Sequence, residues 1–384
     1  MPPSFARLRF LPLLLLNAVG FLRAEPAAAP ASDADATTTT MIPASDPRLQ
    51  WIGRTASTAE GTRKLAYPGV TLRFRYAGAA PTLVFDAASP DCYFNLRING
   101  WDPQIVRLTE GRNRILLPAG PAPASGWEVE WVRRNESWQG IATVLGLELG
   151  SDTRLLPPAA VASAADPRRL LVIGDSITSG HFIEQMPGTP DGSPRTNNAE
   201  RTWGWLLARR LGAEVNIVAY GGRGLTRTWE GRTDQSTAPQ FFERAQPDDP
   251  ASVWDHDRYQ PDAIVVMLGQ NDFNLGIVPE AEFVAAYDAF VARLHAVHPS
   301  AALVLANSPM HDPKPGTPDA EKRAALLRYT EQVAEHARAA GFSRVTTVAV
   351  SHQPGTSLNA HPVAFQHEQI VGEIETTVRE LTGW

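Results

Sequence analysis

The sequence predicts two domains, an all-β sandwich followed by an α/β domain with three layers around a five-stranded parallel sheet. The chain has 384 residues, which is long enough for two domains. Between residues 51 and 150, short runs alternate apolar and polar side chains, as strands with one buried face do. From residue 168 onward, wholly apolar runs alternate with amphipathic segments, which is typical of a parallel sheet covered by helices on both faces.

The first domain, at 47–150, is defined by short strand-like runs separated by turn signals. Tyr67-Pro68-Gly69 and Asn99-Gly100 are two of these signals. Several short strands at this spacing make a sandwich of two sheets the expected architecture. The expected strands cover residues 70–76, 82–85, 93–98, 114–117, 127–133 and 143–149.

The second domain, at 168–384, follows a linker at 151–167 that is rich in Pro and Ala. Ligands of parallel sheets bind at the carboxyl ends of the strands, so the chemistry is expected at this edge. The expected strands are 170–173, 214–219, 263–268, 303–307 and 345–350, and the expected helices are 202–211, 281–297, 319–340 and 362–381.

The first 24 residues have the features of a secretory signal peptide. Arg7 and Arg9 precede an apolar stretch at 11–22, and Ala24 supplies a small residue at the cleavage point. An apolar stretch of about a dozen residues is too short for a bilayer, which needs about 20. We therefore expect a secreted chain with a flexible linker at 25–46 and, after signal cleavage, no membrane contact.

Charge and cysteine content exclude several classes of function. The net charge is −6, and an acidic surface repels phosphate, so nucleic acid is not an expected partner. Cys92 is the single cysteine and forms neither an internal disulfide nor a cysteine-based zinc site. His295 and His298 have the spacing of metal ligands, but complementarity with a helix C-terminus explains them more simply. We expect no metal and no cofactor.

Four candidate residues follow strands of the α/β domain. Ser176 lies at a strand-to-helix turn, and Gly222 lies in a glycine-rich turn where a backbone N–H can approach a ligand. Asn271 can offer its side-chain amide to an oxyanion, and His361 precedes Pro362, which suits the first position of a helix. Each residue alone has an ordinary explanation as a helix cap or a turn. Together they supply the nucleophile, the base and the N–H donors that acyl transfer requires.

These four residues resemble the named positions of the SGNH (GDSL-type) hydrolase superfamily, over residues 168–384. The preceding domain is similar to the β-sandwich segment of carbohydrate esterase family two, in Gly53-Arg54, Tyr67-Pro68-Gly69-Val70, Arg97-Ile98-Asn99-Gly100 and Val132-Arg133-Arg134-Asn135-Glu136. The resemblance implies a jelly-roll domain packed on the catalytic domain. It also implies a secreted serine esterase that removes acetyl groups from plant-wall polysaccharides such as xylan and glucomannan. We expect it to act as a monomer.

One departure concerns the base. Many members of the superfamily have an aspartate three residues before the histidine, and members of the family often have one two residues before it. Here these positions are Leu358 and Asn359, neither of which is a carboxylate. We therefore expect a Ser176–His361 dyad, with the imidazole oriented mainly by a backbone carbonyl and Asn359 as a weaker candidate. The N–H groups of Ser176 and Gly222 and the Asn271 amide are expected to bind the oxyanion.

Several residues and functions remain as alternatives. His181 is a candidate for the border of the site, but a surface loop is the favoured interpretation, and His352 is a rival base. Trp229 is placed either against a sugar ring or in the core. The substrate could instead be acetylated peptidoglycan or a lipid ester. A polysaccharide-binding protein without turnover is the alternative from a different class.

Overall fold

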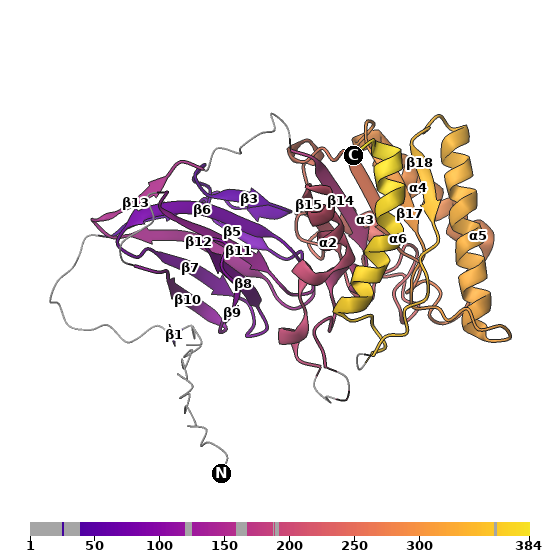
Figure 1. Ribbon diagram of the computed structural model, residues 1–384, viewed down its shortest axis with the longest axis horizontal. Coiled ribbons are helices and arrows are strands. Elements are labelled where there is room, and N and C mark those ends of the chain that lie inside the picture. Colours follow the sequence, from indigo (N-terminus) through magenta and orange to yellow (C-terminus); the bar gives the residue numbers. More distant parts are fainter. Residues whose placement is uncertain are drawn as a thin grey trace, which may run out of the picture.

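The computed structural model describes residues 25–26, 39–119, 125–158, 167–186, 188, 192–356 and 359–384. The expected signal peptide and residues 27–38 of the expected linker lie outside the described residues. Figure 1 shows two domains side by side, a β domain and an α/β domain, in the predicted order along the chain.

Two antiparallel sheets form the N-terminal domain. One sheet has the order β1-β10-β7-β12-β5-β4 with β2 also paired to β12, and the other has the order β13-β6-β11-β8-β9 with β3 paired to β6. The strands are β1 (Glu25–Pro26), β2 (Thr40–Pro43), β3 (Gln50–Ile52), β4 (Thr55–Ser57), β5 (Arg63–Leu65), β6 (Thr71–Gly78), β7 (Thr82–Ala87), β8 (Tyr93–Ile98), β9 (Gln104–Arg107), β10 (Gly111–Leu116), β11 (Trp127–Arg133), β12 (Ala142–Leu149) and β13 (Thr153–Leu156).

The sandwich extends beyond both boundaries expected from the sequence. Strand β2 pairs with β12, and Ala44 just after it is fully buried, so residues 40–46 belong to the domain rather than to a flexible linker. Strand β13 pairs with β6 inside the expected linker at 151–167. Both strands are four residues long. They could not be predicted from the sequence because so short a run shows little of the alternation between apolar and polar residues.

The α/β domain has the predicted five-stranded parallel sheet, in the order β15-β14-β16-β17-β18. Its strands are β14 (Arg169–Gly174), β15 (Glu214–Ala219), β16 (Ala263–Met267), β17 (Ala302–Ala306) and β18 (Val345–Val348). Its helices are α1 (Ser176–Ser179), α2 (Trp203–Leu211), α3 (Ala238–Phe242), α4 (Glu280–Val297), α5 (Pro318–Ala339) and α6 (Ala364–Thr382), with short 3-10 turns at Pro194–Thr196, Ala199–Arg201 and His256–Arg258.

Alternate residues of the central strand β14 serve the two faces of this sheet. Leu170 and Val172 join the apolar cluster that contains the buried sides of α2 and α6. Leu171 and Ile173 join the cluster that contains α3, α4 and α5 and that continues into the sandwich. Because every second side chain of a strand points to the same face, an all-apolar strand buries both of its faces. This arrangement produces the three layers visible in Figure 1.

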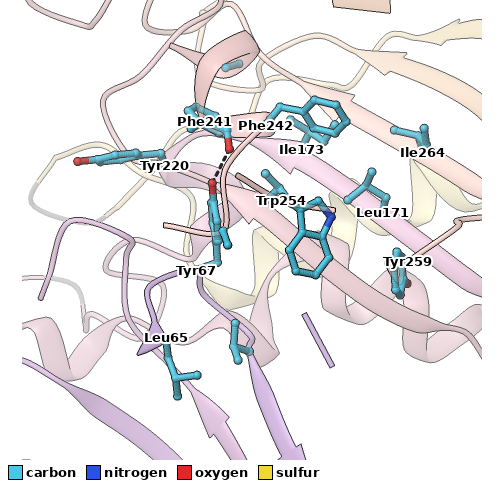
Figure 2. Packing of buried hydrophobic residues seen from close by; sticks show 14 of the residues in the cluster. Leu65, Tyr67, Leu171, Ile173, Tyr220, Phe241, Phe242, Trp254, Tyr259 and Ile264 are labelled. Carbon is cyan, nitrogen blue, oxygen red and sulfur yellow. Dashed lines mark hydrogen bonds between the residues drawn. The ribbon is translucent and has the colours of Figure 1, made fainter. Parts of the chain in front are cut away.

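The two domains share one apolar core. Leu65 and Tyr67 of the sandwich belong to the same apolar cluster as side chains of the α/β domain. Figure 2 shows Tyr67 beside these side chains, and its hydroxyl donates a hydrogen bond to the Phe241 carbonyl at 2.6 Å. Arg54 is buried between the domains, 5.0 Å from the ring centre of Phe242 and 5.1 Å from that of Trp254. Burial lowers the pKa of Arg54 to about 10, so it remains a cation at neutral pH. These contacts hold the sandwich in a fixed position against the α/β domain.

Candidate active site

The nucleophile candidate follows directly from the end of strand β14. Asp175 caps the short helix α1 by accepting the Ile177 N–H at 3.0 Å, which places Ser176 at the first helical position. Gly174 precedes the turn, and a Cβ there would lie 2.0 Å from the Thr178 hydroxyl oxygen. Only glycine fits this position, so the strand-to-helix turn holds the Ser176 hydroxyl at the carboxyl edge of the sheet.

His361 lies against Ser176, although 185 positions separate the two residues in the chain. The His361 Nε2 atom is 2.7 Å from Ser176 Oγ, and its Nδ1 atom is 3.1 Å from the main-chain oxygen of Asn359. Because a carbonyl oxygen only accepts, Nδ1 carries the proton and Nε2 is free to accept the serine proton. Burial, with a smaller contribution from the nearby His181, lowers the pKa of His361 to about 3, so the imidazole is neutral at neutral pH.

The side chain of Asn359 does not orient His361. Its Nδ2 atom lies 3.3 Å from Nε2 of His181, whereas the atom in contact with His361 Nδ1 is the main-chain oxygen. The expected backbone carbonyl is therefore present at the base. The Asn359 amide instead joins the site to His181.

Gly222 and Asn271 line the same pocket as Ser176 and His361. Gly222 has a φ of +75°, and a Cβ there would lie 2.8 Å from Cδ1 of Trp229, so both conformation and space require glycine. The Asn271 Nδ2 atom donates to the Arg223 carbonyl at 2.9 Å and lies 3.2 Å from Asp175 Oδ2. These two acceptors fix the orientation of the Asn271 amide. An oxyanion bound in the pocket would share the amide hydrogens with them.

The pocket has a volume of about 740 Å³ and receives side chains from both domains. Trp229 belongs to the loop after β15, and Trp138 belongs to the loop after β11 of the sandwich. Their exposed fractions are 52% and 53%, so each indole presents about half of its surface. Trp229 therefore lines the pocket and is not part of the core, so the core placement considered from the sequence is wrong.

Three residues of the site were missed by sequence reasoning. Glu136 and Trp138 come from the sandwich, where strand periodicity gives no sign of which loop faces the other domain. Glu136 is fully buried, and its Oε2 atom accepts the Gly221 N–H at 3.0 Å. His181 was interpreted as a surface-loop residue, but it is buried, and its ring centre is 4.7 Å from that of His361. The tilted ring of Phe182, at 3.9 Å between ring centres, accounts for part of this burial.

Other polar residues of the α/β domain have structural roles. Asp272 accepts the N–H groups of Leu225 and Thr226 and so holds the loop after Gly222. His367 accepts the Trp203 N–H at 3.0 Å and fixes α6 against α2. His352 lies 3.9 Å from Asp312 and does not line the pocket, so it is not the base.

The described residues contain no group of three or more His, Cys, Asp or Glu side chains that could hold a metal. His295 stacks on Phe342 at 4.1 Å between ring centres, and burial lowers the pKa of His298 to about 3. His298 is therefore uncharged at neutral pH, and the helix-dipole interpretation of this histidine is wrong. In the same part of the chain, no helix is both long and apolar enough to cross a membrane.

Comparisons with known proteins agree with this two-domain arrangement. Residues 172–364 match the GDSL-like lipase/acylhydrolase family, and residues 51–158 match the carbohydrate esterase 2 N-terminal domain. An acetylxylan esterase / glucomannan deacetylase of Cellvibrio japonicus is 33% identical over 374 residues, which are 97% of this chain and 99% of the relative.

Solved structures of family two carbohydrate esterases have the same fold. The structure from Cellvibrio japonicus has a TM-score of 0.80 at 33% identity and covers 90% of this chain and 99% of its own. One from Corynascus thermopiles, which also carries a carbohydrate binding domain, has a TM-score of 0.72 at 26% identity and covers 88% and 100%. The chain therefore belongs to the GDSL-like lipase/acylhydrolase family of carboxylic ester hydrolases and has the two-domain architecture of carbohydrate esterase family 2.

Proposed function

We propose that this protein is a secreted serine esterase that removes O-acetyl groups from plant cell-wall polysaccharides, with acetylated xylan or glucomannan as its substrate. The observation that carries the proposal is the 2.7 Å contact between Ser176 Oγ and His361 Nε2, two residues that line the pocket between the domains. The name of the Cellvibrio japonicus relative supports the substrate class. The two half-exposed indoles of Trp138 and Trp229 support it as well, because such rings present apolar faces on which a sugar can pack.

The reaction proceeds through an acetyl-enzyme intermediate. Ser176 Oγ attacks the acetyl carbonyl carbon while His361 Nε2 takes its proton. The sugar oxygen then leaves with that proton, and the acetyl group remains on Ser176. A water molecule attacks the ester in the second half, His361 again accepts the proton and returns it to Oγ, and acetate is released.

Three N–H groups stabilise the oxyanion of each tetrahedral intermediate. They are the main-chain N–H groups of Ser176 and Gly222 and the side-chain amide of Asn271, all in residues that line the pocket. Asn271 donates most strongly when negative charge develops, because an oxyanion competes better than the Arg223 carbonyl for the amide hydrogen.

Ser176 and His361 act as a dyad. The main-chain oxygen of Asn359 fixes the tautomer of His361, which is one of the two roles of a triad carboxylate. A carbonyl carries no full charge, so it performs the second role, stabilisation of the imidazolium, less well. The mature protein acts as a monomer outside the cell, without nucleic acid or membrane partners.

The experiment is acetate release by the wild type and by Ser176→Ala from acetylated xylan, acetylated glucomannan and O-acetylated peptidoglycan. We expect release from the first two substrates, lost in Ser176→Ala. Preference for peptidoglycan would change the substrate class. Glycan binding without acetate release would support a binding protein and overturn the proposed esterase. N-terminal sequencing of protein exported by its host would test secretion and cleavage after Ala24.

A further inference from the structure

The sandwich contributes a buried carboxylate to the active site that the proposed mechanism does not use. Glu136 follows strand β11, is fully buried and lines the catalytic pocket. Its Oε2 atom accepts the Gly221 N–H at 3.0 Å, and its Oε1 atom lies 3.0 Å from Nδ1 of His181. The fit is tight, because a Cβ on Gly221 would lie 2.4 Å from Oε2.

This burial is costly unless the charge is compensated. A carboxylate removed from water needs hydrogen bonds or a cationic partner. Among the described residues, Glu136 forms no ion pair with Lys or Arg, and the side chain beside its Oε1 atom is the imidazole of His181. The contact is short but not aligned as a hydrogen bond, so it is mainly electrostatic. Folding stability alone does not explain such a group, because an apolar side chain would fill the space at less cost.

Contacts lead from Glu136 to the base. The amide nitrogen of Asn359 only donates, so the His181 Nε2 atom at 3.3 Å accepts from it. His181 then carries its proton on Nδ1, the atom that faces Glu136. The main-chain oxygen of the same Asn359 holds Nδ1 of His361. Glu136 is thus connected to the catalytic imidazole through the side chain of His181 and then through the side chain and main-chain oxygen of Asn359.

The segment at the end of this connection needs support. Ala360, between Asn359 and His361, has a φ of +56°, a conformation that costs a non-glycine residue about 1–2 kcal/mol. Gly355 packs so closely that a Cβ there would lie 2.0 Å from the Ala360 carbonyl oxygen. The contact between Asn359 and His181 helps to hold the segment in this conformation, and with it the carbonyl that orients the base.

We propose that Glu136 is a positioning residue for His361 that acts from the sandwich domain through His181 and Asn359. It sets the tautomer of His181, fixes the Asn359 segment and places a negative charge near the imidazolium that forms during turnover. The last of these is one of the two roles of the carboxylate that is absent at positions 358 and 359. The proposal rests on the proposed function, because it concerns the base of that reaction.

The test compares Glu136→Gln with Glu184→Gln. Glutamine keeps the shape of Glu136 and an oxygen that accepts the Gly221 N–H, and it removes the charge. Glu184 is the matched control, because it pairs with the buried Arg134 across the same domain boundary without lining the pocket. We expect Glu136→Gln to lower kcat on acetylated xylan about tenfold with KM unchanged, less than the ~10⁴-fold loss when a directly bonded triad carboxylate is neutralised. Glu184→Gln should retain wild-type kcat.

Two further readouts separate positioning from general damage. ¹⁵N chemical shifts of His181 should show the Nδ1–H tautomer in the wild type and lose it in Glu136→Gln. His181→Ala should lower kcat similarly, and the Glu136→Gln/His181→Ala double variant should be no worse than the worse single variant, because both act through one connection.

Wild-type kcat in Glu136→Gln, or additive losses in the double variant, would overturn the proposal. If Glu136→Gln does not fold, the proposal is tested with His181→Ala alone. A lower kcat with unchanged KM in this variant would support the proposal, and wild-type kcat would overturn it. Ser176→Ala is measured beside these variants. If it retained activity, the proposed function itself would fail, whereas an inactive Ser176→Ala beside a fully active Glu136→Gln would refute only the role of Glu136.

Discussion

Replacing Asn359 by alanine tests whether the main chain or the side chain of this residue orients the catalytic histidine. The His361 Nδ1 atom donates to the main-chain oxygen of Asn359 at 3.1 Å, and this oxygen is present whatever side chain the residue carries. The substitution removes only the 3.3 Å contact between the Asn359 amide and His181. A hydrogen bond of this kind contributes about 0.5–1.5 kcal/mol, and about 1.4 kcal/mol corresponds to a tenfold change in rate.

We therefore expect Asn359→Ala to lose about tenfold or less in kcat/KM. His361→Ala removes the base itself and should lose about 10²–10⁴-fold or more. Asn359→Asp should give no gain in kcat/KM, because its carboxylate would face the unprotonated Nε2 of His181 and not Nδ1 of His361. The assay is the initial rate of acetate release from one acetylated substrate, with 4-nitrophenyl acetate as a second substrate that needs no glycan binding.

Circular dichroism and the melting temperature of each variant serve as the control for folding. If Asn359→Ala fell as far as His361→Ala while remaining folded, the side chain would be a true third member of the catalytic group. The dyad with a carbonyl partner would then be wrong.

Three other outcomes are expected. Asn271→Ala should lose about 10²–10³-fold in kcat, the usual effect of removing one oxyanion donor; near-normal turnover would exclude its amide from the oxyanion hole. Because burial lowers the pKa of His361 to about 3, an NMR titration of its ring should show it neutral at pH 5.5, where an ordinary histidine is about 90% protonated; a midpoint near 6.5 would contradict this. A protein beginning near Asp166 exposes the apolar surface that Leu65 and Tyr67 cover and should aggregate or bind polymer more weakly, and unchanged kinetics on polymer would show independent domains.

The edge of the sheet at which the site lies could be predicted from the sequence because parallel topology constrains it. Ser176, Gly222 and Asn271 each follow an apolar strand, and parallel strands bring their carboxyl ends to one edge. His361 follows the last strand in the same way. Such positions can be predicted without knowing how the side chains pack. The structure places all four residues around one pocket.

The contribution of the sandwich could not be predicted in this way. Glu136 and Trp138 lie in the loop after strand β11. The sequence of this loop indicates where the strand ends, but not which part of the molecule the loop contacts. That this loop faces the catalytic pocket is decided by the packing of the two domains, to which Tyr67 and the buried cation Arg54 contribute. His181 was misplaced for a related reason, because its neighbours Trp138 and Glu136 come from the other domain.

The most direct test of the proposed chemistry is acetate release from acetylated xylan or glucomannan by the wild type and by Ser176→Ala at equal protein concentration. Ser176 Oγ lies 2.7 Å from the base, and no other hydroxyl is proposed as nucleophile. We predict steady release by the wild type, and release by Ser176→Ala that cannot be distinguished from the reaction without enzyme. Equal release by the two proteins, or none by the wild type on any acetylated glycan, would contradict the assignment of this site as a serine esterase.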